Sequence, residues 1–172
     1  MTVTSAIVLA AALAALPSLL DGHGAKIPRP AGVPDVIAQV ALEHPEVDAW
    51  LLAATLDVLG AHESGYSTHP RGLNDHGRSK GFGQTPRAST PDDLLGQVRE
   101  AARWVIVSWK GCPAFPLSRY ATGVRCEGAS AMSVGGTPRA AERVPVWVTY
   151  QREVIAEYAV LQPPLQAAEG SR

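Results

Sequence analysis

The side chains best suited to chemistry lie in residues 61–86, where a polar, glycine-rich stretch follows an apolar one. Glu63 stands at the boundary between the two. A carboxyl group that is buried against apolar neighbours has a raised pKa, because burial disfavours its charged form. A carboxylic acid that stays protonated near neutral pH can donate a proton to a leaving oxygen, as glycosidic-bond cleavage requires. Glu63 is therefore a candidate general acid, and a solvated glutamate at a helix end is the alternative interpretation.

A second carboxylate, Asp75, lies in the same polar stretch. A carboxylate opposite the acid could activate a water on the far face of a sugar ring, as it does in inverting glycosidases. The surrounding residues 74–77, Asn-Asp-His-Gly, are also typical of a tight turn in which an aspartate binds nearby backbone. Both interpretations of Asp75 stay open.

The polar stretch also contains three regularly spaced histidines, His62, His69 and His76. A zinc site on a helix commonly uses His-Glu-x-x-His, and here Tyr66 stands where the second histidine would be. Histidines spread across a loop need not converge on one ion. We therefore expect no metal and no other cofactor.

A helix is expected to position Glu63. The segment 48–62 places Leu52, Leu56 and Leu59 on one face, with the spacing of a buried helical stripe. The helix would then end beside Glu63 and present it at the start of the polar loop.

Most of the remaining chain also has helical patterning. Three further helices are predicted: one from Pro34-Asp35 to Pro45, one from Thr90-Pro91 to about Trp109, and one from near Pro145 that carries Val148, Ile155 and Tyr158. Thr90 is expected to cap its helix, and Pro91 suits the first helical position. Residues 110–136 are expected to be irregular, with a short helix around 117–121. Without an extended alternating pattern, the fold class is mostly α.

Composition limits the function classes. The chain has 172 residues with a formal net charge of −1, which excludes a globally basic nucleic-acid binder and predicts no nucleic-acid partner. Hydrophobic residues make up 46%, enough for a packed core. The 16 glycines and 14 prolines predict long loops or linkers.

The chain divides by composition into four segments. Residues 1–20 carry no charged side chain and form an apolar segment that could be a secretory signal, a membrane anchor or a helix docked on the domain. Residues 21–34 are expected to be a Pro/Gly linker, residues 35–162 the folded domain that carries the candidate site, and residues 163–172 a tail.

The two cysteines, Cys112 and Cys126, are too few for a disulfide framework or a four-thiolate zinc site. They could form one disulfide, which would imply an oxidising compartment, or remain separate thiols.

Three short motifs follow one another along the chain: Glu63-Ser64, then Gly81-Phe82-Gly83-Gln84, then Arg119-Tyr120-Ala121-Thr122-Gly123. In this order they resemble the catalytic domain of soluble lytic transglycosylases and the related goose-type lysozymes. That family has Glu-Ser at the end of a helix, then a Gly-x-x-Gln turn, then a Tyr-Asn-x-Gly turn after another helix. The Gly-x-x-Gln match is complete, whereas the third motif has Ala121 where the family usually has Asn. The resemblance covers residues 36–160.

The resemblance implies a lysozyme-like α domain that cuts the β-1,4 bond between N-acetylmuramic acid and N-acetylglucosamine in peptidoglycan. In such transglycosylases one glutamate acts as acid and then as base. The muramoyl 6-hydroxyl attacks within the same sugar and yields a 1,6-anhydro product, without a metal or a second carboxylate.

By the same resemblance, each motif residue has an expected role. Glu63 would be the catalytic acid/base, and Ser64 would orient the substrate or Glu63. Gly81 and Gln84 would line the sugar groove, and Tyr120 would form a hydrogen bond near the Glu63 carboxyl. The alternative interpretations are a surface turn amide for Gln84 and an ordinary packed aromatic side chain for Tyr120.

Two alternatives to a transglycosylase stay open. One is a lysozyme-type muramidase, a hydrolase in which Asp75 would assist. The other is a non-catalytic peptidoglycan-binding or assembly module of a secretion or phage particle, which Ala121 in the third motif favours. The expected partner is the peptidoglycan glycan strand, with membrane contact only if residues 1–20 are an anchor. The expected location is periplasmic or otherwise extracytoplasmic, or the protein is delivered by a phage particle.

Overall fold

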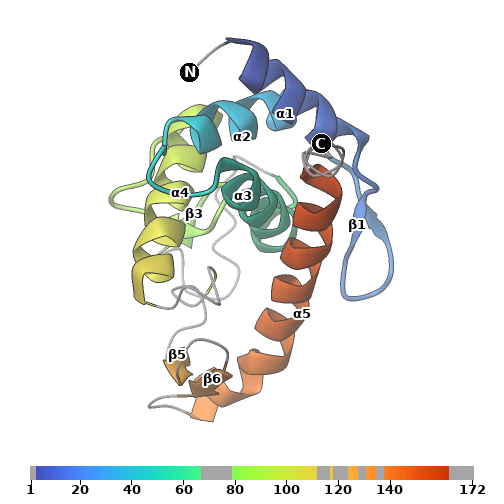
Figure 1. Ribbon diagram of the computed structural model, residues 1–172. Coiled ribbons are helices and arrows are strands. Elements are labelled where there is room, and N and C mark those ends of the chain that lie inside the picture. Colours follow the sequence, from blue (N-terminus) through green and yellow to red (C-terminus); the bar gives the residue numbers. More distant parts are fainter. Residues whose placement is uncertain are drawn as a thin grey trace, which may run out of the picture.

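The protein is built mainly from helices packed around one central helix. The computed structural model describes residues 3–66, 79–111, 117, 124–127, 131–134 and 138–162. This part of the chain is mostly α, as the sequence predicts. Its helices are α1 (Val3–Ala15), α2 (Val33–Leu42), α3 (Ala49–Ser64), α4 (Leu94–Gly111) and α5 (Pro138–Leu161). Helix α3 lies at the centre, and α2, α4 and α5 all pack against it (Figure 1).

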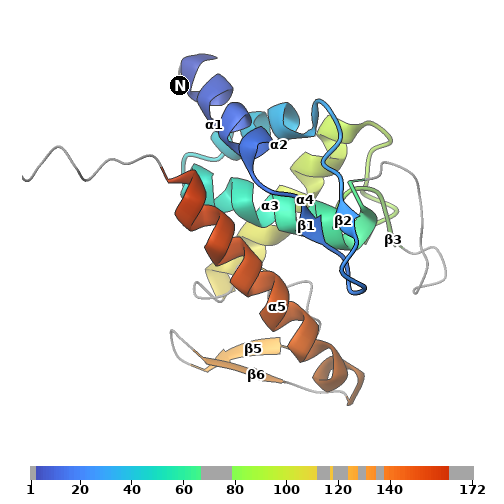
Figure 2. The same cartoon turned by 90° about the vertical axis from the view of Figure 1, so that its right-hand side faces the viewer.

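The N-terminal segment packs onto this helical body. Helix α1 packs mainly against α2 (Figure 2). It buries Leu9 and Leu13 in the common core. Strands β1 (Leu19–Leu20) and β2 (Lys26–Ile27) follow as a short antiparallel hairpin. The apolar segment is therefore a docked helix in this structure, and a signal or anchor role for it stays a prediction. Each helix of the described residues is too short or too polar to cross a bilayer.

Helix α3 buries the three leucines that the sequence predicts, but burial extends to every side of the helix rather than to one face. Asp48 begins it, because its carboxylate accepts hydrogen bonds from the backbone N–H groups of Trp50 (2.8 Å) and Leu51 (3.1 Å). Leu52, Leu56 and Leu59 are fully buried, together with the rest of residues 52–60.

The start of α4 differs from the sequence prediction. Thr90 does not cap the helix; its hydroxyl instead bonds to the hydroxyl of Thr85 and the carbonyl of Pro86, both at 2.7 Å. Asp93 caps it, with Oδ1 accepting the Gly96 N–H at 2.8 Å. The helix therefore begins at Leu94, because a closer aspartate satisfies the free N–H groups.

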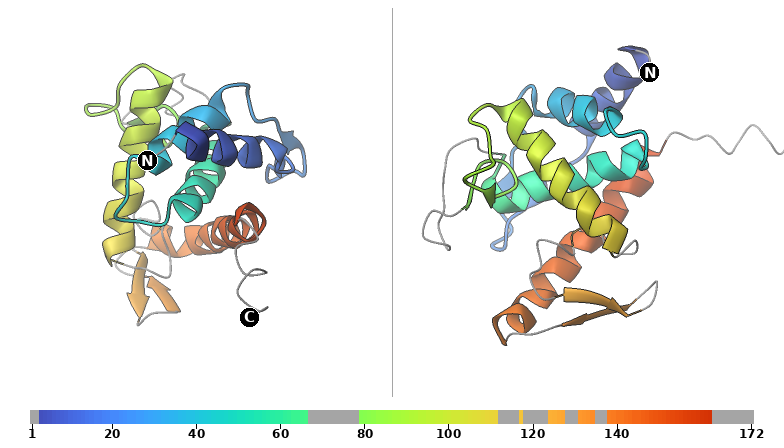
Figure 3. Two further views of the ribbon diagram at one scale, coloured as in Figure 1. Left: turned by 45° about the horizontal axis from the view of Figure 1, so that its top comes forward. Right: turned by 90° about the vertical axis from the view of Figure 1, so that its left-hand side faces the viewer.

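The start of α5 was also predicted wrongly. The helix begins at Pro138, well before Pro145, in keeping with the tolerance of a first helical turn for proline. It runs to one side of α3, with α4 on another side and in a different direction (Figure 3).

Three two-stranded antiparallel hairpins complete the described structure. The second joins β3 (Ser79–Lys80) to β4 (Thr85–Pro86), and the third joins β5 (Val124–Glu127) to β6 (Ala131–Val134). The β5–β6 hairpin lies beside the first turns of α5 (Figure 2). It falls in the segment expected to be irregular, where strands this short leave little pattern in the sequence. The short helix expected over 117–121 lies outside the described residues, apart from the buried Leu117.

Candidate functional site

Glu63 lies in the last turn of the central helix. Helix α3 extends to Ser64, so both residues of the Glu-Ser motif are helical, and both are half-buried. Gly65 ends the helix in the left-handed conformation at φ 60°, which suits glycine because it has no Cβ. Its N–H donates to the carbonyl of Ala61 at 2.9 Å, so the final turn that carries Glu63 is closed.

Ser64 connects the first motif to the second. Its hydroxyl lies 2.8 Å from the carbonyl oxygen of Phe82 and 3.2 Å from that of Gly60, and it can donate to either. The shorter contact crosses from α3 to the Gly81–Gln84 turn. Two motifs that are separate in the sequence are therefore neighbours in space.

Phe82 anchors the Gly81–Gln84 turn in the core. Its side chain is fully buried and lies directly over Gly60 of α3, where any Cβ would overlap the ring. A glycine inside a helix costs about 1 kcal/mol relative to alanine. Gly60 is therefore needed at this position because it lets the turn approach α3.

Gln97 of α4 fixes the start of the same turn. Its side-chain oxygen accepts the Phe82 N–H at 2.9 Å, and its amide nitrogen donates to the carbonyls of Pro91 and Asp92, both at 3.1 Å. Gly81 has φ 75°, and a Cβ there would overlap the Gln97 amide. Gln97 was missed in the sequence, where only its place on the buried face of a helix could have indicated it.

Gln84 folds back onto its own turn. Its side-chain nitrogen donates to the carbonyl of Gly81 at 3.1 Å, and its backbone N–H reaches the same oxygen at 3.1 Å. Gln84 is also left-handed, with φ 47°. The amide thus closes the turn, and its expected contact with a sugar stays a prediction.

Four of the residues predicted for the site cannot be placed around this turn. Asp75, Tyr120 and Cys112 lie outside the described residues. Cys126 lies in β5, opposite Met132 of β6, and only its backbone is described. The second carboxylate, the tyrosine contact and the disulfide therefore stay predictions.

His62 faces α5 on another side of α3. Its Nε2 lies 2.5 Å from Oε2 of Glu153, and its ring stacks on Tyr150 at 4.1 Å between centroids with 12° between the planes. Trp147 packs edge-on against Tyr150 at 5.4 Å. Of the regularly spaced histidines, His69 and His76 lie outside the described residues. Within the part of the chain that the structure describes, no group of three or more His, Cys, Asp or Glu side chains could hold a metal.

A buried charge cluster lies further back along α3. Arg29 donates two hydrogen bonds to the Asp57 carboxylate, from Nε to Oδ1 at 2.8 Å and from Nη2 to Oδ2 at 2.5 Å. Arg29 also donates to the carbonyl of Leu16 at 3.2 Å, and its Nη2 lies 3.5 Å from Oε1 of Glu157. Tyr66 donates its hydroxyl to Oδ1 of Asp57 at 3.1 Å.

Glu157 carries its proton in this cluster. Burial, with the charge of Asp57 adding to it and that of Arg29 opposing it, raises the pKa of Glu157 to about 9. One cation, Arg29, is thus matched by one anion, Asp57. Burial also raises the pKa of Tyr66, so this side chain remains a hydrogen-bond donor. This cluster was not predicted from the sequence. The isolated Asp57 within an apolar helix was the one signal that a buried carboxylate needs a partner.

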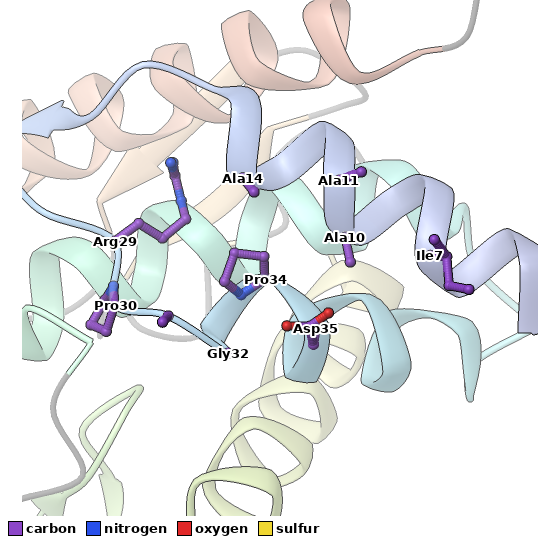
Figure 4. Close-up of a pocket in the computed structure, with 10 residues that line it drawn as sticks. Ile7, Ala10, Ala11, Ala14, Arg29, Pro30, Gly32, Pro34 and Asp35 are labelled. Atoms are coloured by element: carbon purple, nitrogen blue, oxygen red, sulfur yellow. The ribbon is translucent and has the colours of Figure 1, made fainter.

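A pocket of about 360 Å³ lies between α1 and the start of α2 (Figure 4). Its lining is mainly small and apolar, with Ala10, Ala14 and Pro34 among its residues and Asp35 at the start of α2. None of the Glu63, Ser64 or Gly81–Gln84 residues lines it. It therefore does not coincide with the site predicted from the sequence.

Comparisons were made with family models, with curated proteins and with solved structures, and none of them matches this chain.

Proposed function

We propose that the protein is a peptidoglycan-cleaving lytic transglycosylase of lysozyme-like fold, with Glu63 as its acid/base. The observation that carries the proposal is the 2.8 Å contact between Ser64 and the Phe82 carbonyl. It makes the Glu-Ser end of α3 and the Gly-x-x-Gln turn neighbours, which is the arrangement expected from the resemblance. The half-buried place of Glu63 at a closed helix end supports the proposal further.

In the proposed reaction, the Glu63 carboxyl donates its proton to the glycosidic oxygen as the bond to C1 of N-acetylmuramic acid breaks. The resulting carboxylate then accepts the proton of the 6-hydroxyl, whose oxygen bonds to C1 to give the 1,6-anhydro sugar. The proton count balances, because Glu63 ends as it began. No metal or cofactor takes part in this scheme.

The first test is the Glu63→Gln variant, which keeps the size of the side chain but cannot donate the proton. We expect it to lose about 100- to 10,000-fold of the rate at which wild-type protein clears peptidoglycan suspensions, as removal of a general acid does. The exposed Glu46→Gln variant is the matched control and should keep full activity. Unchanged activity in Glu63→Gln with an intact fold would rule out the proposal.

Mass spectrometry of the products separates the alternatives. Anhydro ends indicate a transglycosylase, whereas reducing ends indicate a muramidase. Tight binding to peptidoglycan with no soluble fragments would instead favour the non-catalytic module. The substrate would place the protein outside the cytoplasmic membrane or in a phage particle.

A further inference from the structure

The last turn of α3 forms side-chain hydrogen bonds to two other elements, the Gly81–Gln84 turn and α5. On one side, Ser64 contacts the Phe82 carbonyl of the turn. On another side, His62 contacts Glu153 of α5 at 2.5 Å. Glu63 lies between these two residues in the sequence, so its backbone is held from both directions.

The His62 contact is well formed for such a role. The His62 side chain is only 7% exposed, and its ring is stacked on Tyr150, so its orientation is fixed by packing as well as by the hydrogen bond. Glu153 is 27% exposed, so it can be changed without leaving a large buried cavity. Terminal helical turns otherwise tend to fray and to open locally.

We propose that Glu153 is a positioning residue, which acts through His62 to hold the last turn of α3, and with it the residue Glu63, in place. The proposal rests on the proposed function of Glu63. Glu153 would hold His62 as a hydrogen-bond acceptor, since its Oε2 lies within hydrogen-bonding distance of the His62 Nε2. A proton donor must be held within fractions of an ångström of its target, and a 1 Å misplacement can cost about 100-fold in rate.

The chain offers a matched control at the other end of α3. Tyr158, also on α5, donates its hydroxyl to Oδ2 of the capping residue Asp48 at 2.7 Å. The Tyr158→Phe variant therefore removes a hydrogen bond between the same two helices, but far from Glu63. A general loosening of the α3–α5 contact would affect both variants in the same way.

The kinetic test uses initial rates on solubilised glycan strands. We expect Glu153→Ala to lower kcat by about 10- to 100-fold. KM should change by less than about twofold, because substrate binding is not the affected step. Glu153→Gln keeps an acceptor oxygen and should restore most of the rate, and Tyr158→Phe should leave kcat unchanged. Equal kcat in Glu153→Ala and the wild type would overturn the proposal.

A second measurement does not depend on activity. The Gly65 and Tyr66 amides donate to Ala61 and Gly60, and their hydrogen exchange reports opening of the last turn. Exchange should become at least about tenfold faster in Glu153→Ala and stay unchanged in Tyr158→Phe. Unchanged exchange in Glu153→Ala would overturn the positioning role whether or not the protein is an enzyme. An inactive wild type, with faster exchange in Glu153→Ala, would instead overturn the proposed function and leave Glu153 only the role of holding the helix end.

If Glu153→Ala does not fold, His62→Phe provides the same test, since it keeps a ring against Tyr150 but removes the hydrogen bond. We expect the same loss of protection at Gly65 and Tyr66 and the same fall in kcat. Unchanged protection would again contradict the proposal.

Discussion

The middle and the end of α3 both carry polar side chains, but these side chains are satisfied in different ways. In the middle, Asp57 is fully buried, and its partners Arg29 and Tyr66 surround it. At the end, Glu63 and Ser64 are half-buried, and the neighbouring turn and α5 hold the backbone around them. In the first arrangement, the buried charges are paired with each other. The second holds the end of a helix that carries a half-buried carboxyl group, Glu63.

The largest expected effect is the loss of folding stability when the buried cation Arg29 is removed. Arg29→Ala would leave Asp57 buried without its cation, so we expect the free energy of unfolding to fall by about 3–5 kcal/mol. Arg99→Ala, which breaks the exposed pair with Glu43, is the control and should change the free energy little. Urea denaturation measures both. A small loss in Arg29→Ala would mean that the cluster does not support the fold.

The double variant Arg29→Met with Asp57→Leu sharpens the same test. Replacing both partners of a buried pair by apolar side chains is often neutral. We therefore expect the double variant to regain most of the stability that Arg29→Ala loses, and a further loss would show that the charges themselves are needed.

The next effect is a pH dependence centred on Glu157. The unfolded chain loses this proton near pH 4.5, whereas the folded protein keeps it up to about pH 9. The stabilising contribution of this group is therefore complete below pH 4.5 and falls as the pH rises towards 9.

The Glu157→Gln variant isolates this contribution, because its side chain resembles the protonated acid and does not titrate. Wild type and variant should have similar stability near pH 5, and the variant should be the more stable at pH 8. Urea denaturation across this range gives the difference. Parallel curves for the two proteins would contradict the protonated state of Glu157.

The smallest effect on stability is expected at the end of α3. Ser64→Ala removes the contact to the Phe82 carbonyl and should lower the free energy of unfolding by only about 1 kcal/mol. If this end is the reactive site, the variant should lose peptidoglycan-cleaving activity out of proportion to that small change. If activity falls only in proportion to the unfolded fraction, Ser64 has a structural role, like the residues in the middle of α3.

The sequence predicted those features that depend on local patterns. The spacing of Leu52, Leu56 and Leu59 predicted the central helix, whereas the turn at Gly81–Gln84 was expected only from the family resemblance. The cap of α4 was misassigned because Thr90 and Asp93 both suit a helix start, and only the tertiary contacts of Thr90 with Thr85 and Pro86 decide between them.

Contacts between distant residues could not be predicted from such patterns. Asp57 indicates a buried carboxylate, but nothing near it in the sequence identifies Arg29 or Glu157 as its partners. The same holds for His62 and Glu153, whose pairing depends on how α5 crosses α3. For the candidate site, the sequence predicted the residues of two motifs, but not that Gln84 would bond to its own turn or that Gln97 would fix it.

The cluster around Arg29 also constrains when the chain can finish folding during synthesis. Its members come from the loop after β2, from α3 and from α5, so Glu157 leaves the ribosome long after Arg29 and Asp57. Until Glu157 arrives, α3 and the N-terminal helices can pair with one another, but α5 does not yet cover Asp57 and Arg29. Contacts of such long range slow folding. We therefore expect the nascent chain to remain incompletely packed around Arg29 and Asp57 until α5 emerges.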